Sequence, residues 1–229
     1  MKIHPGRFAE ILRIGFPASL QGVIFAISNV IIQSSVNSFG STVVAGNSAA
    51  SNIEGFVYVS MNSFYQGTIS FTSQNVGAGI YERVNKILFT AQACVIVTGL
   101  VLGNLAVLFG HDLLGFYTKS AAVKAAGMNR LKIICTVYAL CGIMDVMVGS
   151  LRGLGYSVMP TIVSLVGACG LRLLWIFTFF RMYGQFHTPQ SLYLTYPVSW
   201  LITICAHVIC FVIVRRKIGR RFTENSPAR

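Results

Sequence analysis

The chain has 229 residues, of which 54% are hydrophobic and only 10% are charged, and its formal net charge is +12. Soluble domains carry about 25% charged residues, so this composition excludes an ordinary soluble globular domain and predicts an integral membrane protein. The positive charge does not predict a nucleic-acid partner, because the basic residues gather at the ends of long apolar segments, where they set membrane topology and contact anionic lipid.

Six segments are long and apolar enough to cross a hydrocarbon core about 30 Å thick, which takes roughly 20 mostly apolar residues per helix. In chain order these segments cover residues 15–39, 44–73, 85–109, 132–151, 158–180 and 193–214. They lack the alternating polarity of membrane β-strands, so we expect helices. The predicted fold is an all-α membrane protein with six transmembrane helices.

Both ends of the chain are predicted to lie outside the bilayer core. Apolar and charged residues in 1–14 follow a helical repeat, which is typical of an amphipathic helix at a membrane interface. The predicted transmembrane lobe covers 15–217, and a basic tail covers 218–229. Twelve basic residues lie at the end of the segments that carries both termini and five, including Arg130, at the opposite end, so the positive-inside rule predicts cytoplasmic termini.

The sequence gives little support for an enzyme. It contains no GxxxxGK[ST], HExxH or GxSxG motif, and its four histidines are scattered. None of the six cysteines forms a CxxC pair, so we expect packing residues rather than a disulfide or a zinc site. No enzymatic activity and no cofactor are predicted.

Three ionisable residues lie well inside predicted spans: Glu54 in the second, Asp145 in the fourth and Arg172 in the fifth. Such residues cost several kcal/mol at that depth and usually face a cavity or a partner. We therefore expect both acids to face the interior of the lobe and to be functional. Arg172 is the expected charge partner, and a purely structural neutralisation of Asp145 by Arg172 is the alternative.

Polar and aromatic residues recur at helical spacing in the first two segments, so they are expected to share one face of each helix. The residues predicted to line a cavity are Asn29, Gln33, Asn47, Tyr58 and Tyr65, with Glu54 among them. A carboxylate among aromatic faces can bind an organic cation through cation–π contacts. Hydrogen bonding between helices is the alternative role for the amides.

Five motifs follow one another along the chain: GFPASLQG at 15–22, VNSFGSTVVAGNSAASNIE at 36–54, TSQNVGAGIYER at 72–83, LRGLGYSVMP at 151–160 and YPVSW at 196–200. Their order and their spacing relative to the six segments resemble the second half of a multidrug and toxin extrusion (MATE) transporter, over about residues 5–217. The resemblance implies one six-helix lobe of a twelve-helix transporter whose two lobes form a V-shaped cavity. It also implies a partner in the membrane, either an amino-terminal lobe or another copy.

The resemblance further implies a secondary antiporter of the plasma membrane that exports small cationic drugs in exchange for Na⁺ or H⁺. In that interpretation Asp145 binds the coupling ion, with Na⁺ possible there, and Glu54 assists it or binds the drug. The coupling ion is the only cofactor implied.

Two alternatives stay open. A half of a lipid-linked oligosaccharide flippase would need a cavity rich in arginine and lysine for anionic phosphates, whereas Arg172 is the only arginine within a predicted span. A truncated, non-transporting membrane subunit would be stable without activity.

Overall fold

The computed structural model describes residues 4–224, with the side chains of residues 7, 10, 14 and 219–224 left out. The described chain is helical almost throughout, and its elements are α1 (Pro5–Asn37), α2 (Ser41–Gly77), α3 (Arg83–Leu108), α4 (Gly110–Gly115), α5 (Ala121–Ile134), η1 (Cys135–Val137), α6 (Ala139–Gly153), α7 (Val158–Ser164), η2 (Leu165–Gly170), α8 (Leu171–Trp175), η3 (Ile176–Phe180), η4 (Gly184–Phe186) and α9 (Pro189–Glu224). The predicted all-α fold class is confirmed.

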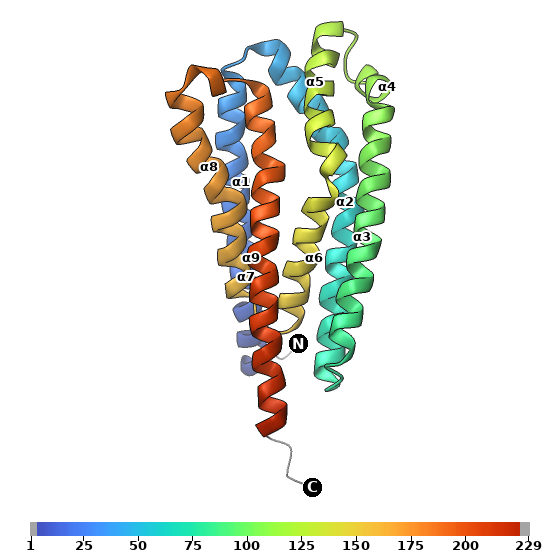
Figure 1. Cartoon of the computed structure of the whole chain (residues 1–229), viewed down its shortest axis with the longest axis vertical. Helices are drawn as coiled ribbons and strands as arrows, with labels where there is room; N and C mark the ends of the chain where they lie inside the picture. Colours follow the sequence, from blue (N-terminus) through green and yellow to red (C-terminus); the bar gives the residue numbers. More distant parts are fainter. Residues whose placement is uncertain (1–3, 225–229) are drawn as a thin grey trace.

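Within residues 4–224 the elements form six long rods that stand side by side (Figure 1): α1, α2, α3, the α5–α6 pair, the run from α7 to η3, and α9. Four of these are long and apolar enough to cross a membrane, and the α5–α6 pair, bent by 48°, is a fifth. The sixth, α2, spans 37 residues but is less apolar. Its only charged residue is Glu54, so uncharged polar side chains lower its hydropathy.

The ends of the rods differ from the predicted boundaries. Helix α1 runs without interruption from Pro5 through Pro17 to Asn37, so no break separates the predicted interfacial helix from the first span. Pro5 is tolerated there because the first residues of a helix have no intrahelical partner for their N–H groups. The fourth rod begins at Ala121, eleven residues before its predicted start at 132. The interfacial position of residues 1–14 stays a prediction, and residues 225–229 of the basic tail lie outside the described range.

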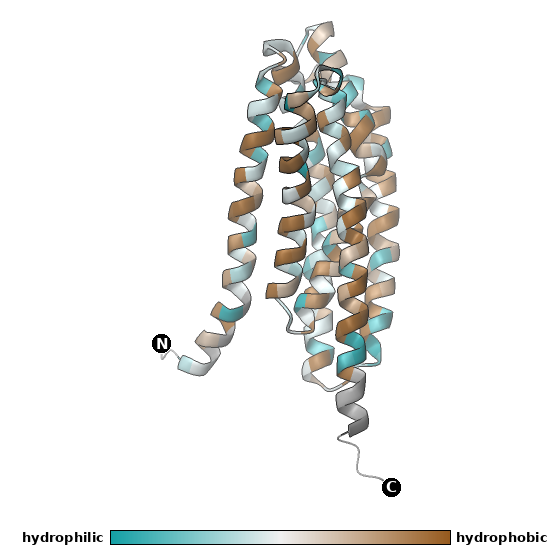
Figure 2. Cartoon of the chain, turned by 60° about the vertical axis from the view of Figure 1, so that its left-hand side comes forward, coloured by the Kyte–Doolittle hydropathy of each residue, from teal (hydrophilic) through white to brown (hydrophobic). Residues whose placement is uncertain are grey.

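The rods form two groups that meet through α6 and α9. One group contains α2, α3 and the α5–α6 pair, and the other contains α1, the α7–η3 run and α9 (Figure 1). Figure 2 shows hydrophobic residues along the outward faces of the long helices and the lower part of α1 standing away from its neighbours. The buried apolar core includes Ile53, Val57, Met61, Val95, Met144, Met147 and Trp200.

Glycines allow α2 to pack directly on α5 and α6. A Cβ atom on Gly46 would lie 2.6 Å from the carbonyl oxygen of Val123 and 2.7 Å from the backbone nitrogen of Gly127. On α6, a Cβ atom on Gly149 would lie 2.9 Å from the carbonyl oxygen of Tyr65. These contacts place the polar face of α2 opposite α5 and α6, which is the arrangement that creates the site described below.

Replacing Gly46 with alanine is therefore expected to destabilise the lobe by about 1–3 kcal/mol, the usual cost of overpacking. The effect should appear as a lower thermal unfolding midpoint of the detergent-solubilised protein. Gly67→Ala in the same helix is the matched control, because nothing lies within 4 Å of its Cβ position and alanine is the better helix former by about 0.5–1 kcal/mol. Equal midpoints for the two variants would contradict the close approach of α2 to α5.

Candidate functional site

A cavity of about 550 Å³ lies between α1, α2, α6, α8 and α9, with one residue from α5 in its wall. The structure places on this wall every residue that the sequence singled out: Asn29, Gln33, Asn47, Glu54, Tyr58, Tyr65, Asp145 and Arg172. These residues come from four helices, α1, α2, α6 and α8, and the packing of the helices brings them to one cavity. Their functional roles stay predictions.

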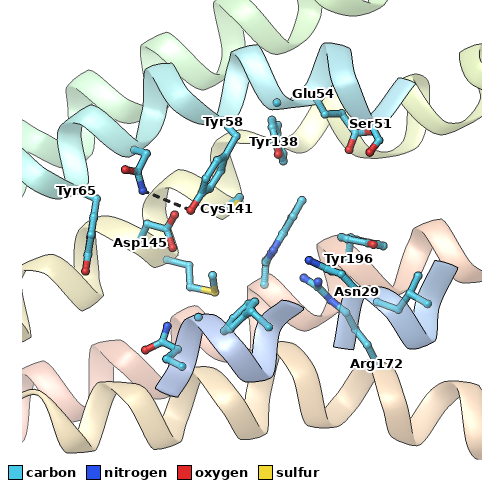
Figure 3. A pocket seen from close by; sticks show the side chains of 18 of the residues that line it. Asn29, Ser51, Glu54, Tyr58, Tyr65, Tyr138, Cys141, Asp145, Arg172 and Tyr196 are labelled. Atoms are coloured by element: carbon cyan, nitrogen blue, oxygen red, sulfur yellow. Dashed lines mark hydrogen bonds between the residues drawn. The ribbon is translucent and has the colours of Figure 1, made fainter. Parts of the chain in front are cut away.

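Helical periodicity explains the two longest parts of the wall. Asn29 and Gln33 are one turn apart on α1, so both face the cavity. On α2 the wall residues recur at intervals of three, four and seven from Asn47 to Tyr65, and Figure 3 shows Glu54, Tyr58 and Tyr65 along one side of the helix. The polar stripe that lowers the hydropathy of α2 is thus the cavity face of this helix.

Glu54 is held by a bidentate ion pair with Arg130 on α5. Arg130 Nε donates to Glu54 Oε1 at 2.8 Å and Nη2 donates to Oε2 at 2.7 Å. The third guanidinium nitrogen, Nη1, donates to Asn47 Oδ1 at 2.8 Å, and Asn47 Nδ2 in turn donates to Gln33 Oε1 at 2.9 Å. Both charges are buried, with Glu54 5% and Arg130 7% exposed. This network joins α1, α2 and α5.

The position of Arg130 corrects the sequence prediction, which counted it among the basic residues at one end of the lobe. The long fourth rod begins at Ala121, and the residue therefore lies about two turns inside the helix rather than before it. Its guanidinium also lies 5.4 Å from the ring centroids of both Tyr193 and Tyr196. Both oxygens of Glu54 are engaged by Arg130, so this acid is not a free carboxylate in the structure.

Asp145 on α6 is in a different position. Its carboxylate is half-buried at the cavity wall, and among the described residues it has no hydrogen bond and no ion pair. Figure 3 shows the Tyr58 hydroxyl pointing toward it, and that hydroxyl accepts a hydrogen bond from Asn62 Nδ2 at 3.3 Å. Asp145 is therefore the acid in this cavity that is available to a ligand.

Arg172 is not the partner of Asp145, and that part of the prediction is wrong. Its Nε donates to Ser199 Oγ on α9 at 2.8 Å, and its guanidinium carbon lies 4.1 Å from the ring centroid of Tyr196. The side chain is directed to α9 because α8 packs mainly on that helix and on its own flanking turns. Arg172 is a cavity residue whose contacts were not foreseen.

A third arginine, Arg152, also lines the cavity at the end of α6. Its Nη1 donates to the Tyr65 hydroxyl, and its Nη2 donates to Gln21 Oε1 at 2.7 Å and to Thr161 Oγ1 at 3.3 Å. The wall therefore carries three guanidinium groups and two carboxylates, whereas the sequence predicted a single arginine at this depth.

Sequence reasoning missed several wall residues, namely Gln21, Arg130, Tyr138, Tyr196 and Trp200. Tyr196 and Trp200 are four residues apart, so their spacing in the YPVSW segment was a usable signal for a shared face. Arg130 gave no such signal, because charges near the ends of apolar segments also set topology. Arg152 did give one, since it is seven residues from Asp145 and therefore on the same helical face.

The chain that forms this site is similar in sequence and in structure to known membrane transporters. The sequence profile of the MatE family matches residues 17–178. The probable multidrug resistance protein YpnP of Bacillus subtilis is 28% identical over 94% of this chain and 48% of that protein. The crystal structure of the Vibrio cholerae MATE transporter VcmN in the bent form matches with a TM-score of 0.81 and 19% identity, over 94% of this chain and 48% of that one.

A further structural match is a MOP superfamily transporter from Pyrococcus furiosus, for which a reversed polarity of the binding pocket is described as suggesting a different function. It matches with a TM-score of 0.79 and 18% identity, over 95% of this chain and 48% of that one. The present chain spans about half the length of YpnP and of both transporters of known structure.

Removing Arg130 should destabilise the lobe far more than removing the whole ion pair. Arg130→Met leaves Glu54 buried without a partner, which costs about 3–5 kcal/mol, whereas replacing both members with apolar residues is often nearly neutral. We expect the thermal unfolding midpoint in detergent to fall in the single variant and to recover in Arg130→Met/Glu54→Met. Arg181→Met, at an exposed arginine, is the control. A double variant as unstable as the single one would show that the ion pair itself stabilises the fold.

Proposed function

The chain belongs to the MatE family, and from this premise we propose that it forms one six-helix lobe of a secondary antiporter that exports amphipathic cationic drugs in exchange for H⁺ or Na⁺. The observation that carries the proposal is the unpaired carboxylate of Asp145 in the wall of a 550 Å³ cavity. A cavity of this size is within the range that holds drug-sized ligands, about 300–1,000 Å³.

Exchange follows from competition for one negative charge. When Asp145 holds the coupling ion, its charge is neutralised and a cationic drug loses its main electrostatic partner. When the ion leaves, the drug can bind. Each ligand then lowers the affinity for the other, and this coupling is reciprocal by thermodynamic linkage. The ion gradient sets the direction of the cycle.

The aromatic residues near Asp145 support a cationic substrate. Tyr58 and Tyr65 line the same wall as the carboxylate, and Figure 3 shows both rings on the α2 side of the cavity. An ammonium group can contact the faces of such rings while its charge is balanced by a carboxylate. Tyr58 is 39% exposed, so its ring is accessible to a ligand.

A proton is the simpler coupling ion of the two. Na⁺ would need several oxygen ligands to replace its hydration shell, and Glu54 cannot supply them while both its oxygens hold Arg130. A proton requires only the carboxylate of Asp145. The predicted assisting role of Glu54 is accordingly replaced, in this proposal, by a role in positioning α2 against α5.

The proposal includes a second six-helix lobe, either an amino-terminal half or another copy of this chain, because the chain spans about half the length of the relatives it matches. It also places the lobe in the plasma membrane, in contact with lipid, with both termini in the cytoplasm. In support, α1 begins and α9 ends at the same end of the lobe (Figure 1). That end also carries most of the basic residues.

A flippase for an anionic lipid-linked sugar is the second candidate, and the three cavity arginines are the observation that favours it. Two of these arginines are already engaged, Arg130 by a carboxylate and Arg152 by three acceptors. The Pyrococcus furiosus transporter with a pocket of reversed polarity illustrates that this fold does not by itself fix the polarity of the pocket or the function.

Asp145→Asn is expected to abolish ion-driven export while leaving the lobe folded, because asparagine has nearly the same shape and cannot take up a proton. The measurement is extrusion of a cationic dye from proteoliposomes under an imposed proton or Na⁺ gradient. Asp112→Asn, at an exposed acid on α4 that does not line the cavity, is the matched control. Unchanged gradient-driven export in the Asp145 variant would refute the proposed coupling site.

A further inference from the structure

Arg172 lies on a short helical segment with an unusual backbone on both sides. The five residues of α8 (Leu171–Trp175) are preceded by the π-helical turn η2 and followed by the π-helical turn η3. π-helical turns are rare in proteins and frequently occur at functional sites. They change the rotation of the helix locally, and here they accompany an arginine that lines the cavity.

The Arg172 guanidinium is buried without a carboxylate partner among the described residues. The residue is only 4% exposed, and its fixed polar contact is the hydrogen bond from Nε to Ser199 Oγ. The faces of Tyr196 and Trp200, with centroids 4.1 and 5.7 Å away, offset part of the charge. Nη2 has no hydrogen-bond partner within the part of the chain that the structure describes.

In the other two cavity arginines both terminal nitrogens are engaged, although Arg152, like Arg172, has no carboxylate partner among the described residues. Every nitrogen of Arg130 donates to a carboxylate or an amide oxygen. Both terminal nitrogens of Arg152 donate to side-chain oxygens. A buried charge is tolerated when it is paired and hydrogen-bonded, and in the described part of this cavity Arg172 lacks an ionic partner. Its terminal nitrogens are therefore free to bind an anion.

We propose that Arg172 forms an anion subsite that binds a carboxylate, or another oxyanion, carried by the transported molecule. The inference rests on the proposed export function and names a second recognition group in the same cavity. Since Nε is occupied by Ser199, the oxyanion binds at the edge formed by Nη1 and Nη2, where the planar guanidinium suits two parallel hydrogen bonds.

Asn29 on α1 is placed to complete this subsite. Figure 3 shows Asn29, Arg172 and Tyr196 at one end of the cavity, while Asp145 lies toward the other end. The amide of Asn29 can donate a further hydrogen bond to the oxyanion. The cavity then has an acidic end and a basic end, and a substrate that carries both kinds of group has one preferred orientation in it.

The test compares the binding of two xanthene dyes that differ only in one group, a free carboxylate or its methyl ester. The purified chain is placed in nanodiscs of neutral lipid, with Trp175→Phe so that Trp200, beside Arg172, is the sole tryptophan. Quenching of its fluorescence reports binding. We expect the acid to bind about tenfold more tightly than the ester, as for a hydrogen bond between charged groups.

Arg172→Gln is expected to reduce this preference to nearly none, and Arg172→Lys, which keeps the charge but loses the planar fork, to give an intermediate value. Arg181→Gln, at an exposed arginine, is the control and should keep the full preference. Equal binding of acid and ester by the unmodified cavity overturns the inference, and so does a preference that survives Arg172→Gln. If the glutamine variant does not fold, the lysine variant and the comparison of the two dyes still decide.

Two further measurements are needed. One distinguishes a substrate carboxylate from a lipid headgroup at Arg172, and the other distinguishes failure of the anion subsite from failure of the proposed coupling at Asp145. Adding an anionic phospholipid to the nanodiscs should weaken acid binding only if a lipid headgroup occupies the Arg172 site, and we expect the preference to stay. Loss of the preference would overturn the assignment to the substrate. The acid-to-ester ratio is measured by binding alone, without an ion gradient, so failure of the coupling proposal in the transport assay leaves this binding test standing.

Discussion

The ion pair between Glu54 and Arg130 decides which charged groups of the cavity wall are already paired, and it positions α2 against α5. In hydrocarbon, neither charge would be tolerated alone, because an isolated buried ion costs several kcal/mol. The pair fixes α2 against α5 and continues through Asn47 to Gln33 on α1. The close approach at Gly46 and Gly127 lies on the same two helices, eight residues before Glu54 on α2 and three residues before Arg130 on α5. Backbone packing and charge pairing therefore support the same arrangement.

The pairing of Glu54 with Arg130 determines which charged side chains of the cavity have no ionic partner. Because Arg130 engages Glu54, the described part of the cavity keeps one unpaired carboxylate, Asp145, and one buried arginine without an acid, Arg172. These two groups lie on α6 and on α8, in different helix groups of the lobe. A movement of one helix group relative to the other therefore changes the distance between Asp145 and Arg172. In the antiporter proposed above, alternating access would be a change of this kind.

The helices and the polar faces of α1 and α2 in the cavity wall were predictable from the sequence, whereas the pairing of the charged groups was not. Hydropathy identifies long apolar helices, and the helical repeat alone puts Asn47, Glu54, Tyr58 and Tyr65 on one face. Glu54 and Arg130 are 76 residues apart, and their contact depends on the early start of α5, which hydropathy does not mark. Arg172 was assigned to Asp145 because both lie at membrane depth, but packing places it against α9 instead.

The cost of placing polar groups in hydrocarbon also bears on the open wall of the cavity. Asn29 and Tyr58 face the cavity yet remain exposed, and both carry polar groups that hydrocarbon cannot satisfy. This side of the lobe must therefore contact water or protein rather than lipid tails. The outward faces of the helices, rich in exposed valine, leucine and phenylalanine, suit lipid instead. A second lobe placed over the polar side, as proposed above, would enclose Asp145 and Arg172 in one chamber and shield this open wall from lipid.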